Sequence, residues 1–211
     1  MAFSAKIVIF LTDSTNKETC AAKAKYLKME QQKNKIQDQI EKTLLADRKI
    51  FLWGQIDDKT ARHVVERLLF LDSQNHEEIQ LYLSSPGGYV TAGFAIYDTM
   101  KVLNSPVSTI CSGISASMAA ILLSAGAKGR RFIQPHANVM IHQPSGGAQG
   151  QASNIEIQAT EILRIRDLSA RILAENCNQD YNRILKDFNR DYWMHAEESV
   201  EYGIVDGILG K

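Results

Sequence analysis

Cysteine is scarce in this 211-residue chain, and its few positions exclude two classes of protein. The three cysteines, Cys20, Cys111 and Cys177, are odd in number, lie far apart and match no metal-ligand spacing. Neither a disulfide-stapled secreted domain nor a structural zinc site is therefore expected. A reducing compartment is favoured, and we expect a cytoplasmic protein that holds no metal.

Net charge and long apolar runs are absent as well. The 24 Lys and Arg residues balance 24 Asp and Glu residues, whereas a dedicated nucleic-acid binder would carry a basic excess. No run approaches the roughly 18 apolar residues of a membrane span. The apolar residues 7–11 form a run shorter than the core of a signal peptide, which has about 7–15 residues. We therefore expect neither nucleic acid nor a membrane among the partners.

What the chain does contain is a regular alternation of strand-like and helix-like segments, in which strands start about every 28 residues. Strands are predicted at 49–53, 79–85, 106–113, 130–135 and 137–144. Helices are predicted at 57–72, 90–104 and 115–127. This alternation is typical of βαβ units and predicts an α/β fold with a parallel sheet.

The N-terminal part is expected to be an appendage to this domain. Residues 17–49 are rich in Lys, Gln and Glu, with apolar residues spaced along one side of a helix. They predict an amphipathic helix that is broken near Asn34, and a solvated lead-in is favoured over docking. Residues 1–16 fit a short strand, a flexible arm or a propeptide. We assign 1–36 to an N-terminal arm or helix and 37–211 to the main domain.

A long helix is predicted from about Ser153, after a Gly-rich connector. Its apolar residues cover most of its circumference: Ile155, Ile157, Ala159, Ile162, Leu163, Ile165, Leu168, Ile172 and Leu173. A helix that is apolar nearly all round is buried on several sides. The pattern therefore predicts that this helix packs against another subunit.

Three serines interrupt the small, apolar stretch 109–132, and a buried hydroxyl without a partner costs roughly 1–3 kcal/mol. Ser112 is expected to end a strand and Ser115 to cap the next helix, which gives both a local use. Ser117 is expected in the first turn of that helix, where free N–H groups and the positive end of the dipole gather. A serine there could attack a carbonyl whose oxyanion is met by adjacent amides. The lipase-type pattern G-x-S-x-G is not matched, so the residues alone leave both a nucleophile and simple helix-start packing open.

A serine nucleophile needs a base, and the five histidines are unequal candidates. His63 and His76 are expected at the surface, His136 in a turn and His195 at a helix start. His142 ends the apolar run ANVMI and begins a Gly-rich segment. Strand ends are where α/β sheets gather their chemistry. His142 is the candidate base, with a satisfied core histidine as the alternative.

Several longer segments carry a resemblance to a known family. They read LYLSSPGGYVTAGFAIYDTM, STICSGISASMAA, SAGAKGRRF, VMIHQPSGGAQGQASNIEI and RDYWMHAEESVEYGIVDGIL, in that order. From about residue 37 to the end, the chain resembles the proteolytic subunits of the Clp protease family. The resemblance implies a ClpP/crotonase-type spiral of βαβ units. It implies a head at about 37–144 and 178–211, with a protruding handle helix at about 145–177.

The resemblance also implies a chemistry, that of a serine endopeptidase which degrades unfolded proteins to short peptides. The family's Ser-His-Asp triad falls here on Ser117, His142 and Asp191. The aspartate rests on the resemblance alone, because reasoning from the residues does not separate Asp191 from Asp187 or Asp206.

Two further parts of the family's site carry over to this sequence. The amides of its oxyanion hole fall on Gly88 and Met118, although an ordinary Pro-Gly turn explains the glycine equally well. The edge on which the substrate lies extended falls on Ser145, Gly146 and Gly147. Pairing through backbone hydrogen bonds there implies cleavage with little sequence specificity.

The partners implied by the resemblance are stacked heptameric rings, built of this chain alone or with a paralogue, and an AAA+ unfoldase. The unfoldase consumes the ATP, and the subunit itself needs no cofactor. A pocket for the unfoldase's apolar anchor falls on Tyr82, Ile110, Phe132 and Leu209. Three further pocket positions are polar where the family tends to be apolar or aromatic: Gln80, Ser112 and Gln134. Residues 1–20 do not match the segment that lines the family's axial pore.

Two other functions stay open at this point. The polar pocket favours a ring subunit with a mainly structural or regulatory role beside a more active paralogue. A crotonase-type acyl-CoA enzyme shares the spiral architecture but has no use for a Ser-His-Asp set.

Overall fold

The computed structural model describes residues 17–147 and 149–210 and divides the chain into two compact units. One unit ends at Asp47 and the other begins at Arg48. The first unit contains helix α2 (Lys17–Ala46), and the predicted boundary after residue 36 falls inside this helix. The predicted break near Asn34 is wrong, because one Asn among strong helix formers costs only about 0.7 kcal/mol or less. The predictions for residues 1–16 lie outside the described residues.

The second unit is built on one sheet, which is parallel except at one edge. Five strands lie side by side in the order β1 (Lys49–Trp53), β2 (Ile79–Ser85), β3 (Val107–Ala116), β4 (Arg131–Ile133) and β7 (Gly207–Ile208). Strand β5 (Asn138–Ile141) pairs in parallel with the end of β3, and β6 (Tyr192–Met194) pairs antiparallel with β5. The α/β fold with a parallel sheet is thus confirmed, with an antiparallel edge that the pattern did not predict.

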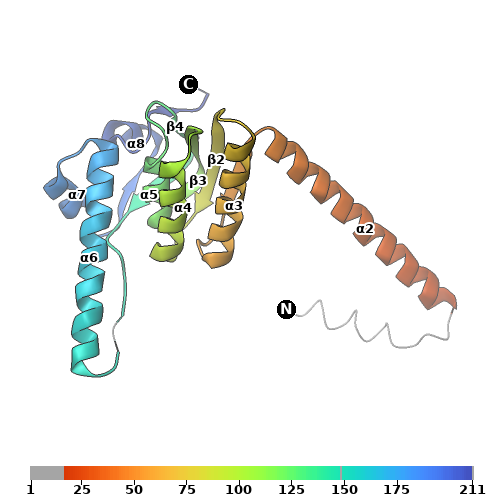
Figure 1. The fold of residues 1–211 in the computed structure, drawn as a ribbon, viewed down its shortest axis with the longest axis horizontal. Coiled ribbons are helices and arrows are strands. Elements are labelled where there is room, and N and C mark those ends of the chain that lie inside the picture. The colour runs from red at the N-terminus through yellow and green to blue at the C-terminus, as the bar shows by residue number, and fades with distance from the viewer. Residues whose placement is uncertain (1–16, 148, 211) are drawn as a thin grey trace. The chain divides into compact units, whose positions relative to one another are not determined.

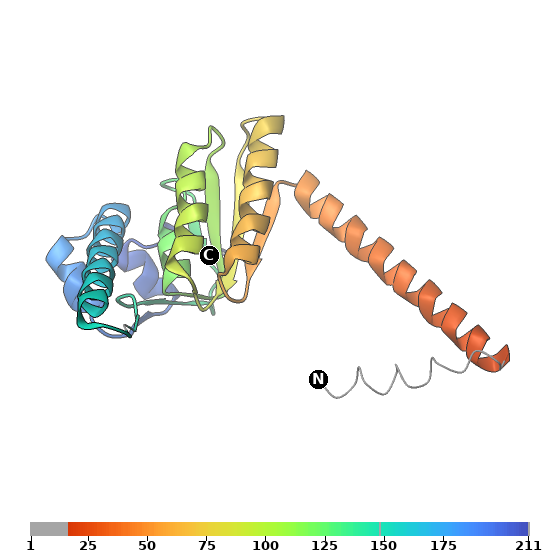
Figure 2. The same ribbon diagram turned by 60° about the horizontal axis from the view of Figure 1, so that its bottom comes forward.

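The first three helices of this unit pack beside one another. Helices α3 (Asp58–Gln74) and α4 (Val90–Val102) lie side by side against the strands in Figures 1 and 2, and α5 (Met118–Ser124) contacts α4. Helix α3 begins where predicted, because the Asp57 carboxylate accepts a hydrogen bond from the Thr60 N–H. Strand β2 alternates buried and half-buried residues, so one face of the sheet forms the core against these helices.

Helix α6 (Ala152–Cys177) is long, and its first half projects beyond the sheet (Figure 1). Its last turns are buried against the rest of the unit through Ser169, Ala170, Leu173 and Cys177. Apolar residues of the first half are exposed in the single chain, among them Ile155, Ile157 and Leu163. After it come α7 (Tyr181–Asp187) and α8 (Ala196–Tyr202). The structure thus leaves apolar surface on the part of the helix that reaches away from its own domain.

A buried ion pair fastens the end of α6 to the sheet. The guanidinium of Arg131 on β4 bonds both carboxylate oxygens of Asp206 and also donates to the main-chain oxygen of Asn176 at 2.8 Å. Burial alone would raise the pKa of Asp206, but the hydrogen bonds from Arg131 outweigh it and hold that pKa below its usual value.

Two of the predicted element boundaries are wrong around the serines. Strand β3 runs on to Ala116, and α5 begins only at Met118. Ser112 therefore does not end the strand, and Ser115 lies within it rather than capping the helix. The extra length comes from an irregularity in the pairing, described below. Within the described residues, no helix is long and apolar enough to cross a membrane.

Candidate active site

A break in strand register brings the end of β3 to a new neighbour. The pairing with β2 jumps from Leu83 opposite Cys111 to Ser85 opposite Ser115, so β3 holds extra residues at this point. Such a bulge bends a strand and redirects the residues after it. Before the bulge β3 pairs with β4, and after it β3 pairs with β5. The bulge therefore carries the residues before Ser117 to the strand that ends just before His142.

Ser117 is the single residue between β3 and α5, where the chain makes a sharp turn that we call the Ser117 elbow. Its backbone has φ 56° and ψ −123°, a conformation that residues other than glycine rarely adopt and that costs about 1–3 kcal/mol. Its N–H donates to the Met140 carbonyl at 2.8 Å, which holds the turn against β5. A similar strand–turn–helix arrangement exposes the nucleophilic serine of α/β-hydrolases, although their G-x-S-x-G pattern is absent here. Ser117 is thus the residue before the helix, not part of its first turn as predicted.

Strand pairing also sets the distance between His142 and Asp191. Strands β5 and β6 run antiparallel with Ile141 opposite Tyr192, so the residue after β5 faces the residue before β6. His142 Nδ1 lies 3.0 Å from Asp191 Oδ1, and His142 Nε2 lies 2.9 Å from Ser117 Oγ. The neutral imidazole satisfies both contacts when Nδ1–H donates to the carboxylate and the serine hydroxyl donates to Nε2. The structure brings the three predicted residues together in one hydrogen-bonded chain.

The three groups differ in exposure to solvent. The His142 side chain is 27% exposed and that of Asp191 is 62% exposed. Two bonds from Gln143 steady the loop before Asp191: its N–H donates to the Phe188 carbonyl at 2.6 Å and its Nε2 to the Asn189 carbonyl at 2.9 Å. The aspartate is therefore held by backbone pairing on both sides rather than by burial.

The other acids and bases considered from the sequence are engaged elsewhere. Asp187 accepts from the Tyr202 hydroxyl at 3.1 Å, and Asp206 is paired with Arg131. His195 caps α8, as expected for a helix start. The two described cysteines are not alternative nucleophiles, since burial raises the pKa of Cys111 to about 11 and of Cys177 to about 12.

The turn after β2 lies directly against the serine. A Cβ placed on Gly87 would come within 2.8 Å of both Ser117 Cβ and the Ala116 oxygen, and within 3.1 Å of the Met118 nitrogen. Gly88, predicted from the family resemblance, is equally confined, because a Cβ there would lie 2.1 Å from the Ile56 oxygen. Gly87 was missed by sequence reasoning, although its place in a Pro-Gly-Gly turn beside a strand end was a usable signal.

Two amides near the serine are available to a ligand. Met118 is the first residue of α5, so its N–H has no acceptor within the helix. Among the described residues, no acceptor is hydrogen-bonded to the Gly88 N–H, since the bridge between Ile56 and Gly88 uses the Gly87 oxygen and the Tyr89 N–H. Both predicted amides therefore lie unpaired next to the elbow.

The predicted substrate edge is an open segment. Ser145, Gly146 and Gly147 follow β5 without secondary structure, and all three are exposed. Gly146 rests on α6, where an added Cβ would lie 2.8 Å from Ile162 Cδ1. Their main-chain groups are thus accessible, three to five residues after His142.

The predicted docking residues form a row across the sheet. Tyr82 on β2 is opposite Ile110 on β3, which is opposite Phe132 on β4, and Leu209 follows β7. Ile110 is only 3% exposed, whereas the other three are half-buried. The hydroxyl of Tyr82 donates to the Gln80 side chain at 3.3 Å. Phe51 stacks on the Tyr82 ring with centroids 5.1 Å apart, an aromatic neighbour that the sequence did not reveal.

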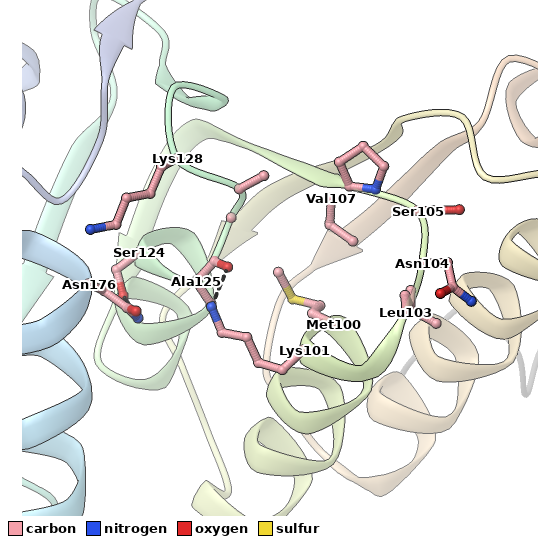
Figure 3. Close-up of a pocket in the computed structure, with 13 residues that line it drawn as sticks. Met100, Lys101, Leu103, Asn104, Ser105, Val107, Ser124, Ala125, Lys128 and Asn176 are labelled. Carbon is pink, nitrogen blue, oxygen red and sulfur yellow. Dashed lines mark hydrogen bonds between the residues drawn. The ribbon is translucent and has the colours of Figure 1, made fainter.

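A cavity of about 290 Å³ lies at the other end of the strands, beside the start of β3, and contains none of these residues (Figure 3). The Lys101 ammonium donates to the Ala125 carbonyl at 3.0 Å there, which satisfies the end of α5. Within the described parts of the chain, no cluster of three or more His, Cys, Asp or Glu could hold a metal ion.

Comparison with known families agrees with the earlier resemblance. The family model described as Clp protease matches residues 6–211, which is nearly the whole chain. The chain therefore belongs to the Clp protease family.

Proposed function

We propose that this member of the Clp protease family is a serine endopeptidase subunit, with Ser117 as nucleophile, His142 as general base and Asp191 as the acid that orients the imidazole. The observation that carries the proposal is the pair of hydrogen bonds linking the three side chains at 2.9 and 3.0 Å, ending at a strained elbow. A base within hydrogen-bond reach of a hydroxyl and oriented by a third group is the arrangement that nucleophilic catalysis requires.

The reaction follows from the positions of these atoms. Ser117 Oγ attacks the carbonyl carbon of a peptide bond while its proton passes to His142 Nε2, and the carboxylate of Asp191 stabilises the imidazolium. The negative charge on the carbonyl oxygen is met by the N–H groups of Gly88 and Met118. The imidazolium then protonates the leaving amine, which departs as the C–N bond breaks. Water, deprotonated by His142, hydrolyses the acyl-enzyme and restores the serine.

The exposed segment Ser145–Gly147 supplies a place for the substrate backbone. An extended peptide that pairs with main-chain groups needs few side-chain contacts, so cleavage should depend little on sequence. Unfolded proteins are the substrate class that can present such an extended backbone.

The partners proposed are further copies of this chain, or of a paralogue, in two stacked heptameric rings. The exposed Ile155, Ile157 and Leu163 on the projecting half of α6 support this, because apolar residues gathered on a protruding helix favour burial against another subunit. An AAA+ unfoldase would deliver the substrate and consume the ATP. The subunit itself would use neither metal nor cofactor.

The decisive experiment compares two serines. Ser117→Ala should lower hydrolysis of short fluorogenic peptides by about 10⁴-fold or more. Ser115→Ala is the matched control, because Ser115 lies two residues away, is fully buried and has no hydrogen-bond partner for its hydroxyl among the described residues. A fluorophosphonate should label Ser117 in the wild type. Substantial activity in the Ser117→Ala protein, or labelling of another residue, would contradict the proposal and reopen the acyl-CoA alternative.

A second candidate function has one observation in its favour. Gln80, Ser112 and Gln134 are polar at the docking row, and each such exchange could cost roughly 1 kcal/mol or more of an apolar anchor's binding. The subunit would then cleave peptides well but support ATP-dependent degradation poorly, with a second ring of a paralogue receiving the unfoldase. Mixing the purified homo-oligomer with its unfoldase, ATP and an unfolded protein tests this. Rapid degradation without any second subunit would exclude the two-ring arrangement.

A further inference from the structure

The turn that lies against Ser117 is held by a serine that has no place in the triad. Ser85, the last residue of β2, is fully buried, and its hydroxyl oxygen accepts a hydrogen bond from the Gly87 N–H at 3.0 Å. A serine that bonds the backbone two residues on closes a local turn. The contact fixes the first peptide of the Pro-Gly-Gly turn from inside the sheet.

Two backbone bonds hold the same turn from its other side. The Ile56 N–H donates to the Gly87 carbonyl at 2.9 Å, and the Tyr89 N–H donates to the Ile56 carbonyl at 2.8 Å. Together with Ser85, these bonds occupy the N–H of Gly87, its carbonyl and the N–H of Tyr89. The N–H of Gly88 is left without an acceptor among the described residues. Its direction depends on the orientation of the peptide planes on either side.

The turn needs such support because its two glycines resist little rotation of their own. Gly87 has φ 93°, and neither glycine has a Cβ to restrict its rotation. An amide that is to meet a developing oxyanion has to be held in place before the reaction begins. The hydroxyl of Ser85 is the only side-chain group bonded to this turn among the described residues.

We infer that Ser85 is a positioning residue for the reaction proposed above: its hydroxyl holds the Gly87 amide so that the Gly88 N–H points at the carbonyl oxygen under attack. This inference rests on the proposed function. It assigns Ser85 no contact with the substrate, and it explains why a hydroxyl is buried at the end of β2. Loss of the hydroxyl frees the Pro86–Gly87 peptide, so that only the bond from the Ile56 N–H to the Gly87 carbonyl still orients the peptide that carries the Gly88 N–H. The transition state then loses part of one hydrogen bond.

The test compares two serines that lie opposite each other on paired strands of the sheet. Ser85 and Ser115 are opposite each other on neighbouring strands and both are 0% exposed, but only Ser85 has a hydrogen-bond partner. Ser85→Ala and Ser115→Ala therefore remove the same group from the same depth. Each protein is assayed with a fluorogenic peptide, with rates normalised to the number of Ser117 sites that a fluorophosphonate labels at completion.

Ser85→Ala should lower kcat by about 10- to 100-fold, less than the 10²- to 10³-fold seen when an oxyanion donor is removed altogether. Its KM should stay within about twofold of the wild-type value, because the loss of an interaction that is made only in the transition state does not weaken substrate binding. Ser115→Ala should keep both constants within about twofold of the wild type. A purely structural role for Ser85 would instead lower the melting temperature and leave kcat per labelled site unchanged, and that result would overturn the inference.

A second readout does not depend on activity. A crystal structure of the Ser85→Ala protein should show the peptide between Pro86 and Gly87 in more than one orientation, or rotated from its wild-type direction. The same single orientation as in the wild type would overturn the inference. If the wild type neither hydrolyses peptides nor labels at Ser117, the proposed function fails, and the crystal structure alone then decides whether Ser85 holds the turn.

Discussion

Adding one methyl group at Gly87 should disable the proposed site without replacing any of the three side chains of the proposed triad. In Gly87→Ala the new Cβ would lie 2.8 Å from Ser117 Cβ and from the Ala116 oxygen, whereas ordinary contact begins at 3.4 Å. The two backbones would therefore have to separate by about 0.6 Å. The neighbours are main chain and Cβ, so neither can turn aside as a flexible side chain would.

The expected loss is worked from that displacement. Misplacing reacting groups by about 1 Å costs roughly 10²-fold in rate, so a separation of about 0.6 Å at the elbow should lower kcat by about 10- to 100-fold. At about 1.4 kcal/mol per tenfold, this is a loss of about 1.4–2.7 kcal/mol of transition-state stabilisation. The positive φ of 93° adds backbone strain of about 1–3 kcal/mol to the folded state.

A second glycine separates these two effects. Gly129 has a similarly positive φ of 80°, but a Cβ there meets nothing within 4 Å. Gly129→Ala should therefore lower the melting temperature to a similar degree and leave kcat unchanged. Peptide hydrolysis and thermal unfolding of both variants provide the comparison. Equal activities in the two proteins would refute the argument that the Gly87 turn and the Ser117 elbow are in fixed contact.

Three further predictions concern other parts of the molecule. Because hydrogen bonds from Arg131 hold the pKa of Asp206 below its usual value, that carboxylate stabilises the fold above about pH 4 and ceases to do so as pH falls through its folded-state pKa. Asp206→Asn should accordingly lower the free energy of unfolding by about 2 kcal/mol at pH 7, and a difference that grows in acid would contradict this. Leu163→Glu should weaken association of the proposed rings, and sedimentation identical to the wild type would count against α6 as the contact. Asp191→Asn should lower kcat by about 10³- to 10⁴-fold, because the amide favours the wrong imidazole tautomer, and kinetics within tenfold of the wild type would remove the aspartate from the mechanism.

Much of the sheet could be predicted from the sequence because its signals are local. The run from residue 79 to residue 85 alternates inward and outward residues and ends in a Pro-Gly turn, so its limits agree with those of β2. Strands β6 and β7 have only three and two residues, too few for any periodicity to register. Both strands were therefore missed, and with β6 the antiparallel edge that it forms with β5 beside the candidate site.

The residues of the candidate site likewise differ in whether a local sequence pattern indicates them. Ser117 at an expected helix start and His142 at an expected strand end carry local signals that made them candidates, and the family resemblance then selected them. The choice of Asp191 over Asp187 depends on Ile141 pairing with Tyr192, two residues about fifty positions apart, and no local pattern reports such a register. The length of β3 was misjudged for a related reason, because its bulge forms only when both β2 and β5 are present to pair with it.

The late position of β6 in the chain has a consequence during synthesis. A ribosome that has completed residue 150 has already produced Ser117 and His142, but it has not yet made the strand that carries the aspartate into place. Until Tyr192–Met194 pairs with β5, the imidazole has no carboxylate to fix its tautomer. On the proposed function, a nascent chain would therefore reach full hydrolytic activity only after β6 has been synthesised and has paired with β5.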